Sequence, residues 1–209
     1  MKKIAVIDYG MSNLHSVVKS LESVTTREHQ VYIAKNDDEL SEAYCLVLPG
    51  QGAAGSCVNK LTQRFPEIRT KIKNRPFMGI CMGFQVLFDY SEEDKGIECL
   101  SVIKGNVKSF SKTIKNNLKV PHMGWNKVLQ KNNHPIWSDI PNNAFFYFVH
   151  SYYAQCQNKD LELSTSSYEI SFTSSVLLDN IFACQFHPEK SSKYGLQLIS
   201  NFLKWAEEV

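Results

Sequence analysis

The stretch PFMGICMGFQ, from Pro76 to Gln85, decides how this chain is expected to fold. An apolar run of strand length reaches Cys81, which has a glycine two residues to each side, and the chain then reads as a helix. A G-x-nucleophile-x-G pattern between a strand and a helix is typical of a nucleophile elbow. Its glycines remove Cβ atoms that would collide as the strand turns into the helix. The pattern therefore predicts that Cys81 projects from the carboxyl edge of a sheet.

A thiol in this place suits nucleophilic chemistry. The start of a helix carries partial positive charge, which favours the thiolate that attacks a carbonyl carbon. The backbone N–H of Met82 is placed to bind an oxyanion. A tight strand-to-helix turn that carries a buried thiol remains the alternative interpretation.

The rest of the first half predicts a parallel sheet. Apolar runs at 4–9, 31–34, 45–50 and 77–81 alternate with stretches of helical spacing, such as Leu14, Val17, Val18 and Leu21. Strands that alternate with helices form right-handed βαβ units, and runs this apolar fit strands covered on both faces.

After residue 96 strand-like segments follow one another directly, at 97–110, 144–154, 161–170, 170–179 and 180–186. Residues 191–209 predict a closing amphipathic helix, with apolar positions Leu196, Leu198, Ile199, Phe202 and Leu203. We expect surface loops at 112–119 and 131–134. The sequence predicts a three-layer α/β fold: a mostly parallel central sheet flanked by helices, with antiparallel strands added in the C-terminal half. One domain should span residues 1–209.

Composition excludes several classes of function. Lys plus Arg number 23 and Asp plus Glu 21, and the basic residues are scattered, so we expect no nucleic-acid partner. No apolar run of about 18 residues and no signal sequence occurs, which predicts a cytoplasmic protein without a membrane partner. The six cysteines show neither C-x-x-C pairs nor zinc-ligand spacing, so we expect free thiols and no structural metal, with Cys45 and Cys184 as buried hydrophobic residues.

A partner base for Cys81 stands in the segment FHPE, where His187 follows the apolar run 181–186. A strand end would bring His187 to the same edge of a parallel sheet, and Glu189 can bind the far ring nitrogen. His150 is the rival base, but it lies in an aromatic strand without an adjacent carboxylate. Surface or structural roles are expected for the remaining histidines, His15, His29, His122 and His134.

A second glycine-rich turn follows the apolar run 45–50 and includes Gly50, Gln51 and Gly52. Its backbone N–H groups can face a ligand, so it could bind phosphate or complete an oxyanion hole, and a plain turn is the alternative. It is not a P-loop, because no Gly-Lys-Ser/Thr follows. Beside Cys81, the oxyanion role is favoured.

Three motifs in order, LPG-x-G at 48–52, GICMGFQ at 79–85 and HPE at 187–189, make the sequence resemble the class I, or triad, glutamine amidotransferases. The segments IDYGMSNL (7–14), VPHMGWN (120–126), HSYY (150–153) and FHPEKSSKYGLQLISNF (186–202) narrow the resemblance to the glutaminase subunits of imidazole glycerol phosphate synthases. The length fits a free-standing subunit.

The resemblance implies an enzyme that hydrolyses glutamine to glutamate and ammonia through a thioester on Cys81. His187 would be the general base and acid and Glu189 the orienting carboxylate. Met82 and the Gly50–Gln51–Gly52 turn would supply oxyanion N–H groups. No cofactor is implied. The ammonia would pass to a (β/α)8-barrel cyclase, held as a heterodimer, that makes imidazole glycerol phosphate in histidine biosynthesis.

The resemblance also implies which residues bind the substrate and which face the partner. Gln85 and Glu93 would hold the α-amino and α-carboxylate ends of glutamine. Gln85 lies one helical turn beyond Cys81, on the same face. Glu92 is the alternative to Glu93, and a solvated loop is the alternative for both acids. Asn13 and Lys190 match partner-facing positions.

Three positions depart from the family pattern: Ser12, Gln51 and Ala54. These departures leave the catalytic residues unchanged but put the identity of the partner protein and the regulation in question. Three alternative functions therefore stand: a paralogous amidotransferase that feeds a cyclase-like partner in a surface-sugar pathway, a non-catalytic regulatory subunit, and a thiol hydrolase or peptidase that acts alone.

Overall fold

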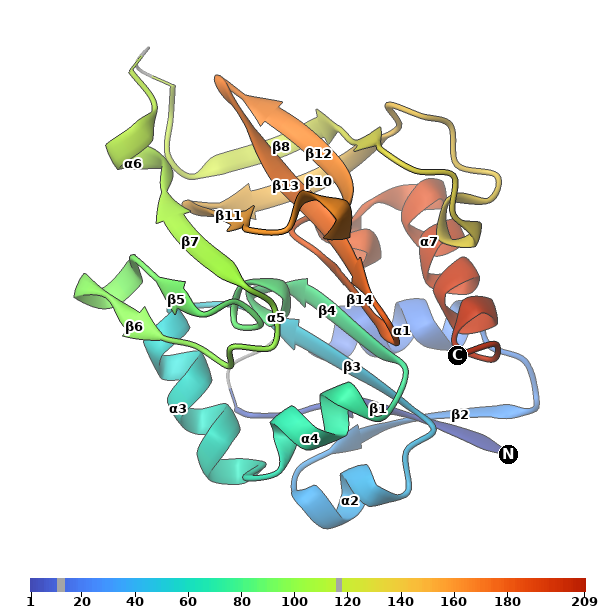
Figure 1. The fold of residues 1–209 in the computed structure, drawn as a ribbon. Helices are drawn as coiled ribbons and strands as arrows, with labels where there is room; N and C mark the ends of the chain where they lie inside the picture. The colour runs from blue at the N-terminus through green and yellow to red at the C-terminus, as the bar shows by residue number, and fades with distance from the viewer. Residues whose placement is uncertain (11–13, 116–117) are drawn as a thin grey trace.

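A computed structural model of the protein describes residues 1–10, 14–115 and 118–209 (Figure 1). The strands are β1 (Lys2–Ile7), β2 (His29–Ala34), β3 (Cys45–Gly50), β4 (Phe77–Cys81), β5 (Tyr90–Ser91), β6 (Ile97–Glu98), β7 (Gly105–Ser109), β8 (His122–Lys127), β9 (Leu129–Gln130), β10 (Phe145–His150), β11 (Tyr152–Cys156), β12 (Glu162–Tyr168), β13 (Ile170–Leu178) and β14 (Ile181–Cys184). The helices are α1 (Leu14–Val24), α2 (Asp37–Ser41), α3 (Ala54–Arg64), α4 (Ile68–Lys73), α5 (Met82–Gln85), α6 (Phe110–Thr113) and α7 (Ser192–Trp205). The 3₁₀ turns are η1 (Glu93–Lys95), η2 (Pro135–Trp137), η3 (Lys159–Leu161) and η4 (Pro188–Lys190).

The main sheet combines a parallel and an antiparallel part. Within the described ranges its order is β2-β1-β3-β4-β14-β13-β11-β7-β5-β6, with β12 and β9 attached through β13. Strands β2, β1, β3, β4 and β14 are parallel to their neighbours in that series. Beyond β14 the strands pair mainly antiparallel. The predicted α/β fold class is therefore confirmed.

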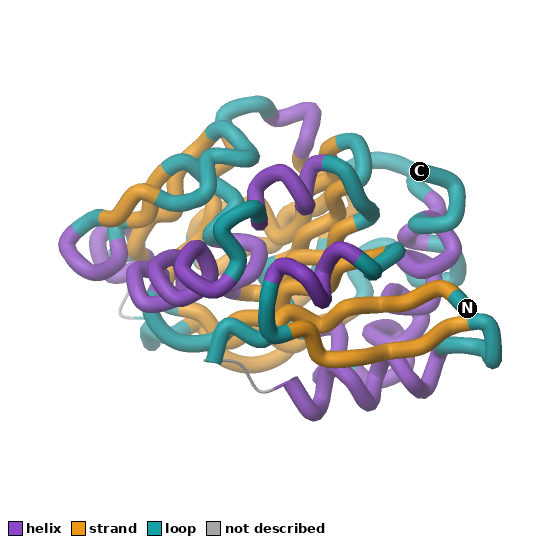
Figure 2. The backbone as a smooth tube through the Cα atoms, turned by 90° about the horizontal axis from the view of Figure 1, so that it is seen from below, coloured by secondary structure: helices purple, strands orange, loops and turns teal. Residues whose placement is uncertain are grey.

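Alternating side chains of the parallel strands build two cores. Ile4 and Val6 of β1 lie in one cluster with side chains of α1 and α7. Ala5 and Ile7 lie in the other cluster, with side chains of α2, α3 and α4. Figure 2 shows these helices on opposite sides of the strand layer. Both faces of the sheet are therefore covered, which is why its strands read as continuous apolar runs.

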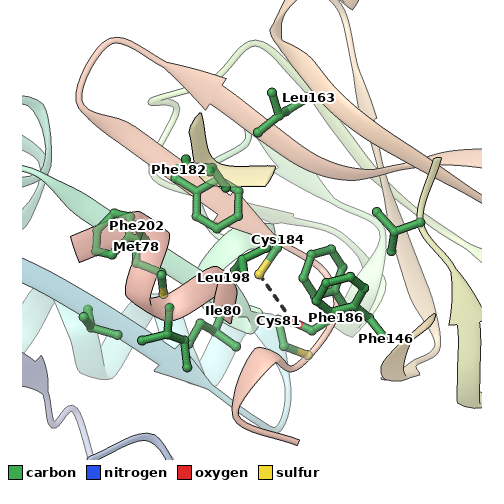
Figure 3. Close-up of a cluster of buried hydrophobic side chains, with 14 of the residues drawn as sticks. Met78, Ile80, Cys81, Phe146, Leu163, Phe182, Cys184, Phe186, Leu198 and Phe202 are labelled. Atoms are coloured by element: carbon green, nitrogen blue, oxygen red, sulfur yellow. Dashed lines mark hydrogen bonds between the residues drawn. The ribbon is translucent and has the colours of Figure 1, made fainter. Parts of the chain in front are cut away.

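Strand β14 belongs to both parts of the sheet. It pairs antiparallel with β13, as the segments after residue 96 predict. On its other side it pairs parallel with β4, with Cys184 opposite Ile80. Figure 3 shows Met78 of β4, Phe182 of β14 and Phe202 of α7 in the cluster of buried side chains that packs against this seam.

Two predicted strand segments prove to be divided. The segment 144–154 divides at Ser151 into β10, which pairs with β8 in a separate two-stranded sheet, and β11, which joins the main sheet. The segment 97–110 holds β6 and β7 with irregular chain between them. Both divisions depend on pairing with distant strands, so local apolar patterns did not indicate them.

Two further predicted segments differ from the structure in detail: one in which residues are buried, the other in where it begins. Helix α7 buries Leu198, Ile199, Phe202 and Leu203, whereas Leu196 is exposed. The loop predicted at 112–119 starts later, because α6 continues to Thr113. Part of that loop, 116–117, lies outside the described residues.

The turn after β4 requires close backbone contact with β3. A Cβ atom on Gly83 would lie 1.9 Å from the carbonyl oxygen of Leu48, and one on Gly79 would lie 2.6 Å from the carbonyl oxygen of Gly83. Cys81 itself has φ 54° and ψ −103°, a positive φ that side-chain-bearing residues rarely adopt. The glycines therefore permit the close contact, and Cys81 takes the strained position of the predicted elbow.

We predict that Gly83→Ala lowers the free energy of unfolding by about 2–4 kcal/mol, because the added methyl group collides with the Leu48 carbonyl. Urea denaturation would measure the change. The control Asn59→Ala, on an exposed position of α3, should change the value by less than about 0.5 kcal/mol. Equal stability of the two variants would contradict the packing described here.

Candidate active site

Three neighbouring strand ends bring distant residues to one edge of the sheet. Gly50, the last residue of β3, pairs in register with Cys81 at the end of β4. Strand β14 lies on the other side of β4, and His187 follows it by three residues. Carboxyl ends of parallel strands are where ligands bind in α/β sheets.

The sulfur of Cys81 lies at the floor of a cavity. The residue is 8% exposed, and its Sγ is 3.9 Å from the carbonyl oxygen of Val149. The side-chain Nε2 of Gln185 donates to the same sulfur at 3.7 Å. Cys81 is thus held between β4, β10 and the end of β14, with one side open to a ligand.

His187 and Glu189 form a buried pair beside this cysteine. Nδ1 of His187 lies 2.7 Å from Oε1 of Glu189, and both side chains are almost fully buried. Burial alone would lower the pKa of His187, but its interactions with Cys81 and Glu189 outweigh that effect and raise the pKa to about 10. Because Nδ1 is bound to Glu189, Nε2 is the ring nitrogen that remains for proton exchange with Cys81; it is buried and has no hydrogen-bond partner among the described residues.

Backbone contacts fix the loop that carries this pair. The N–H of His187 donates to the carbonyl oxygen of Tyr147 at 2.9 Å, and the hydroxyl of Ser191 donates to the carbonyl oxygen of His187 at 2.6 Å. The same hydroxyl accepts the N–H of Tyr147 at 2.9 Å. The imidazole therefore has a defined place relative to β10 as well as to β4.

A cavity of about 390 Å³ opens over Cys81. Its wall combines groups from both parts of the fold: Gln51, Gly52, Cys81, Met82, Gln85, Glu93, Pro121, Val149, His150, Ser151, Tyr152, His187 and Lys190. This volume admits a ligand the size of an amino acid, with the sulfur at one end.

Gln85 lines this cavity and has a buried side-chain oxygen without a hydrogen-bond partner among the described residues. Its Nε2 donates to the carbonyl oxygen of Tyr152 and to Oε1 of Gln185, both at 2.9 Å. Both amide hydrogens are thereby used. Oε1 of Gln85 is buried without a partner among the described residues, so it is the group of this side chain that still lacks a hydrogen bond.

The structure distinguishes the two adjacent acids after α5. Glu93 lines the cavity, and its Oε2 accepts the N–H of Ala54 at 2.8 Å. Burial raises the pKa of the Glu93 carboxyl, although the Ala54 N–H opposes the shift. Glu92 instead accepts the N–H of Ser109 and lies 3.6 Å from Nζ of Lys112. Only Glu93 of these two is therefore placed to reach a ligand over Cys81.

His150 lines the cavity but has both ring nitrogens occupied. Nδ1 lies 2.8 Å from the Tyr152 carbonyl oxygen and Nε2 lies 2.9 Å from Nδ1 of His122. Burial lowers the pKa of His150 to about 3 and that of His122 to about 4. His150 is thus a neutral, hydrogen-bonded wall residue, and His187 is the available base. The sequence predicts a surface or structural role for His122. The residue is buried and bonded to His150, which is a structural role.

The remaining predicted positions fall around the mouth of the cavity or outside the described residues. Gln51 and Gly52 lie on the wall, and Gly50 packs behind them, where an added Cβ would meet Met82 at 2.5 Å. Lys190 is exposed at the rim, with Nζ 6.0 Å from the centre of the Tyr147 ring. Asn13 and Ser12 lie outside the residues that the structure describes.

Sequence reasoning missed one polar residue that contacts the nucleophile, Gln185, and one that supports the Glu93 turn, Asp94. Gln185 is fully buried and contacts both Cys81 and Gln85. The one signal was a polar residue inside the apolar run 181–186. Asp94 accepts the N–H of Gly55 at 3.2 Å, beside the Glu93 contact, so η1 caps the start of α3.

Three general features concern metal binding, membrane spanning and the state of the cysteines. No described His, Cys, Asp and Glu side chains form a group of three or more that could hold a metal ion. Among the residues that the structure describes, no helix is long and apolar enough to cross a membrane. All six cysteines are buried free thiols.

The amino-acid sequence is similar to those of one known protein family. The family model for class-I glutamine amidotransferases matches residues 5–205. The chain is 46% identical to imidazole glycerol phosphate synthase subunit HisH of Nitrosococcus oceani, over 98% of each chain. It is 47% identical to the protein of that name from Thiobacillus denitrificans, over 97% of this chain and 91% of the relative.

Solved structures share the fold at low sequence identity. One is a glutamine amidotransferase with a TM-score of 0.71 and 13% identity, matched over 98% of each chain. Another is a glutamine amidotransferase from Thermotoga maritima, with a TM-score of 0.66, 16% identity and coverage of 99% of this chain and 84% of the other.

We predict that Cys81→Ala lowers the pKa of His187 from about 10, because it removes a group that raises the value. A pKa raised above 6.5 in the folded protein adds stability that is fully present below about pH 6.5 and is lost as the pH rises through about 10. The variant should lose this stability at lower pH than the wild type. NMR titration of the imidazole measures the pKa directly.

Cys45→Ala is the matched control, since Cys45 is a buried thiol that does not act on His187. Its His187 titration should equal that of the wild type. An unchanged titration in Cys81→Ala would contradict the contact between the two side chains.

Proposed function

The chain belongs to the class I glutamine amidotransferases, and from that premise we propose that it is the glutaminase subunit of an imidazole glycerol phosphate synthase. It hydrolyses glutamine to glutamate and ammonia, and the ammonia serves a partner cyclase in histidine biosynthesis. The observation that supports the chemistry most directly is that Cys81 and His187 line one cavity, with Nδ1 of His187 bound to Glu189 at 2.7 Å.

In the first half of the proposed reaction, Cys81 attacks the side-chain amide carbon of glutamine. Nε2 of His187 accepts the thiol proton and donates it to the leaving nitrogen, so ammonia departs and a thioester remains. Glu189 holds the ring orientation and stabilises the imidazolium. The negative oxygen of the tetrahedral intermediate is stabilised by the N–H groups of Met82 and of the Gly50–Gly52 turn.

In the second half, a water molecule replaces the amine. His187 accepts a proton from the water, which attacks the thioester carbon. The carbon–sulfur bond breaks, glutamate leaves, and the proton returns to the sulfur. The sum of the two halves is glutamine plus water to glutamate plus ammonia, with no cofactor in the balance.

Substrate orientation follows from the hydrogen-bonding groups of the cavity. Gln85 offers an unpaired oxygen and Glu93 a carboxylate, so both suit the α-ammonium group of glutamine. The hydroxyl of Ser151, also on the cavity wall, suits the α-carboxylate. We therefore assign Gln85 and Glu93 to the same end of the substrate.

The partner is proposed to be a (β/α)8-barrel cyclase that docks beside the cavity mouth as a heterodimer. On the β8–β10 sheet three large apolar side chains are exposed: Met123 by 61%, Trp125 by 52% and Phe145 by 49%. Such a patch is typical of an interaction surface. Val149 in β10 and Pro121 before β8 line the cavity itself, so a protein on this face would reach the site that releases ammonia.

The sequence segments that carry Asn13 and Lys190 would complete this contact, with the exposed Lys190 available to an acidic side chain of the cyclase. A cytoplasmic location is part of the proposal, since six free cysteines fit a reducing compartment. We also propose that residues 1–209 act as one domain, since the site takes groups from both parts of the sheet.

The alternatives are less well supported. The relatives named imidazole glycerol phosphate synthase subunit favour that function over a surface-sugar pathway. The presence of Cys81, His187 and Glu189 together opposes a non-catalytic subunit. The acceptors at Gln85 and Glu93 favour an amino-acid substrate over the peptide of a free-standing peptidase.

We predict that Cys81→Ala abolishes glutamine-dependent synthesis in the complex with the cyclase, while synthesis from added ammonium salts continues. The reason is that the nucleophile is needed only to release ammonia. Product formation with each nitrogen source measures the two activities. Cys156→Ala, a buried thiol outside the cavity, is the control and should retain both. Loss of both activities in Cys81→Ala would refute this division of labour.

We predict that Glu93→Gln raises KM for glutamine about tenfold, since the neutral amide loses a charge-assisted hydrogen bond to the α-ammonium group. Steady-state kinetics of ammonia release measures it. Glu92→Gln is matched in chemistry and adjacent in sequence but lies outside the cavity wall, so it should leave KM unchanged. The opposite pattern would assign the substrate contact to Glu92.

A further inference from the structure

Gln185 is a buried amide that connects the nucleophile to the substrate-binding wall. It follows β14 directly, has no exposed surface, and its backbone N–H donates to the carbonyl oxygen of Ser174 at 2.9 Å. Its side chain makes two hydrogen bonds. Nε2 donates to Sγ of Cys81 at 3.7 Å, and Oε1 accepts from Nε2 of Gln85 at 2.9 Å.

The neighbours of this amide fix its orientation. If it were turned over, its oxygen would face the sulfur and its NH₂ group would face the NH₂ group of Gln85. The contact with Gln85 would then lack an acceptor, and the sulfur would lose its N–H donor. A single orientation of the Gln185 amide therefore places its N–H toward the sulfur and its oxygen toward Gln85.

The orientation of Gln85 depends on Gln185 in turn. The NH₂ group of Gln85 is occupied by Oε1 of Gln185 and by the carbonyl oxygen of Tyr152. Its own oxygen is buried without a partner among the described residues, in a residue that lines the cavity. Without the acceptor on Gln185, one of the two contacts that hold the NH₂ group away from the cavity would be lost.

We propose that Gln185 is a positioning residue with two effects: it donates an N–H to Cys81 sulfur as negative charge develops there, and it holds the oxygen of Gln85 toward the α-ammonium group of the substrate. The second effect rests on the proposed function, whereas the first does not. A hydrogen bond to the charged form of an acid favours that form. Gln185 should therefore increase the reactive thiolate fraction and the affinity for glutamine.

Two variants separate these effects. Gln185→Met keeps the length of the side chain but removes both hydrogen bonds. Gln185→Glu retains an oxygen that accepts from Gln85 but has no N–H for the sulfur. Gln130→Met is the matched control, because Gln130 is a half-buried glutamine whose amide binds the carbonyl oxygens of Ile140 and Pro141, outside the cavity.

The first readout is the rate of alkylation of Cys81 by iodoacetamide as a function of pH, with mass spectrometry to identify the site. In Gln185→Met the pH midpoint of the rate should rise by about one unit, and in Gln185→Glu by at least as much. The control should match the wild type. The titratable side chains that interact with Cys81 are His187, Tyr9, Cys57 and Cys184, and all of them stay unchanged in these variants.

The second readout is protection of Cys81 from alkylation by glutamine. The protecting concentration should rise about tenfold in Gln185→Met and stay near the wild-type value in Gln185→Glu. A purely structural role would lower the melting temperature without separating the two variants in this way. If Gln185→Met does not fold, Gln185→Leu, which also lacks both hydrogen bonds and adds no charge beside the sulfur, carries the alkylation test.

An unchanged alkylation midpoint in the folded variants would overturn the effect on Cys81, and equal protection in Gln185→Met and the wild type would overturn the effect on Gln85. Failure of glutamine to protect the wild type would instead count against the proposed function. The alkylation midpoint would then still decide the role of Gln185 at the sulfur, because iodoacetamide needs no substrate site.

Discussion

The close contact between the β3 turn and the elbow after β4 is the constraint on which the site depends. Gly83 packs against the Leu48 carbonyl, and Gly50 packs against the side chain of Met82. Helix α5 can begin directly after the last residue of β4 only because these two positions lack a Cβ atom. The positive φ of Cys81 and the place of the Gly50–Gly52 turn beside its sulfur both follow from this contact.

The general base His187 reaches the same edge of the sheet because it follows β14, near the C-terminal end of the chain. This strand is antiparallel to β13 on one side and parallel to β4 on the other. A parallel neighbour of β4 must finish at the same edge as β4, so the residues after β14 reach the elbow. The antiparallel C-terminal part thus leads the chain back into the parallel sheet and delivers His187 to Cys81.

Local sequence predicted the parts of the molecule whose conformation is decided locally. The runs at 45–50 and 77–81 become β3 and β4 with the expected bounds, because apolar strands and glycine turns are encoded within a few residues. The division of 144–154 at Ser151 was not predictable, since β10 and β11 read alike and differ only in their distant partners. Gln185 was missed for a related reason: its two contacts come from β4 and α5.

The proposed binding mode has a consequence for the charge of the ligand. One oxygen of Glu93 is occupied by the Ala54 N–H, and burial raises the pKa of the carboxyl because its charge is poorly solvated. A ligand with an α-ammonium group neutralises that charge and also fills the unpaired acceptor on Gln85. A ligand of the same shape without the ammonium leaves both groups unpaired, which costs far more than the contact itself contributes. Selectivity for an α-amino acid therefore arises from the buried acceptors on Gln85 and Glu93. Gln185 orients the first and the η1 turn orients the second. The space over Cys81 adds a limit on the size of the ligand.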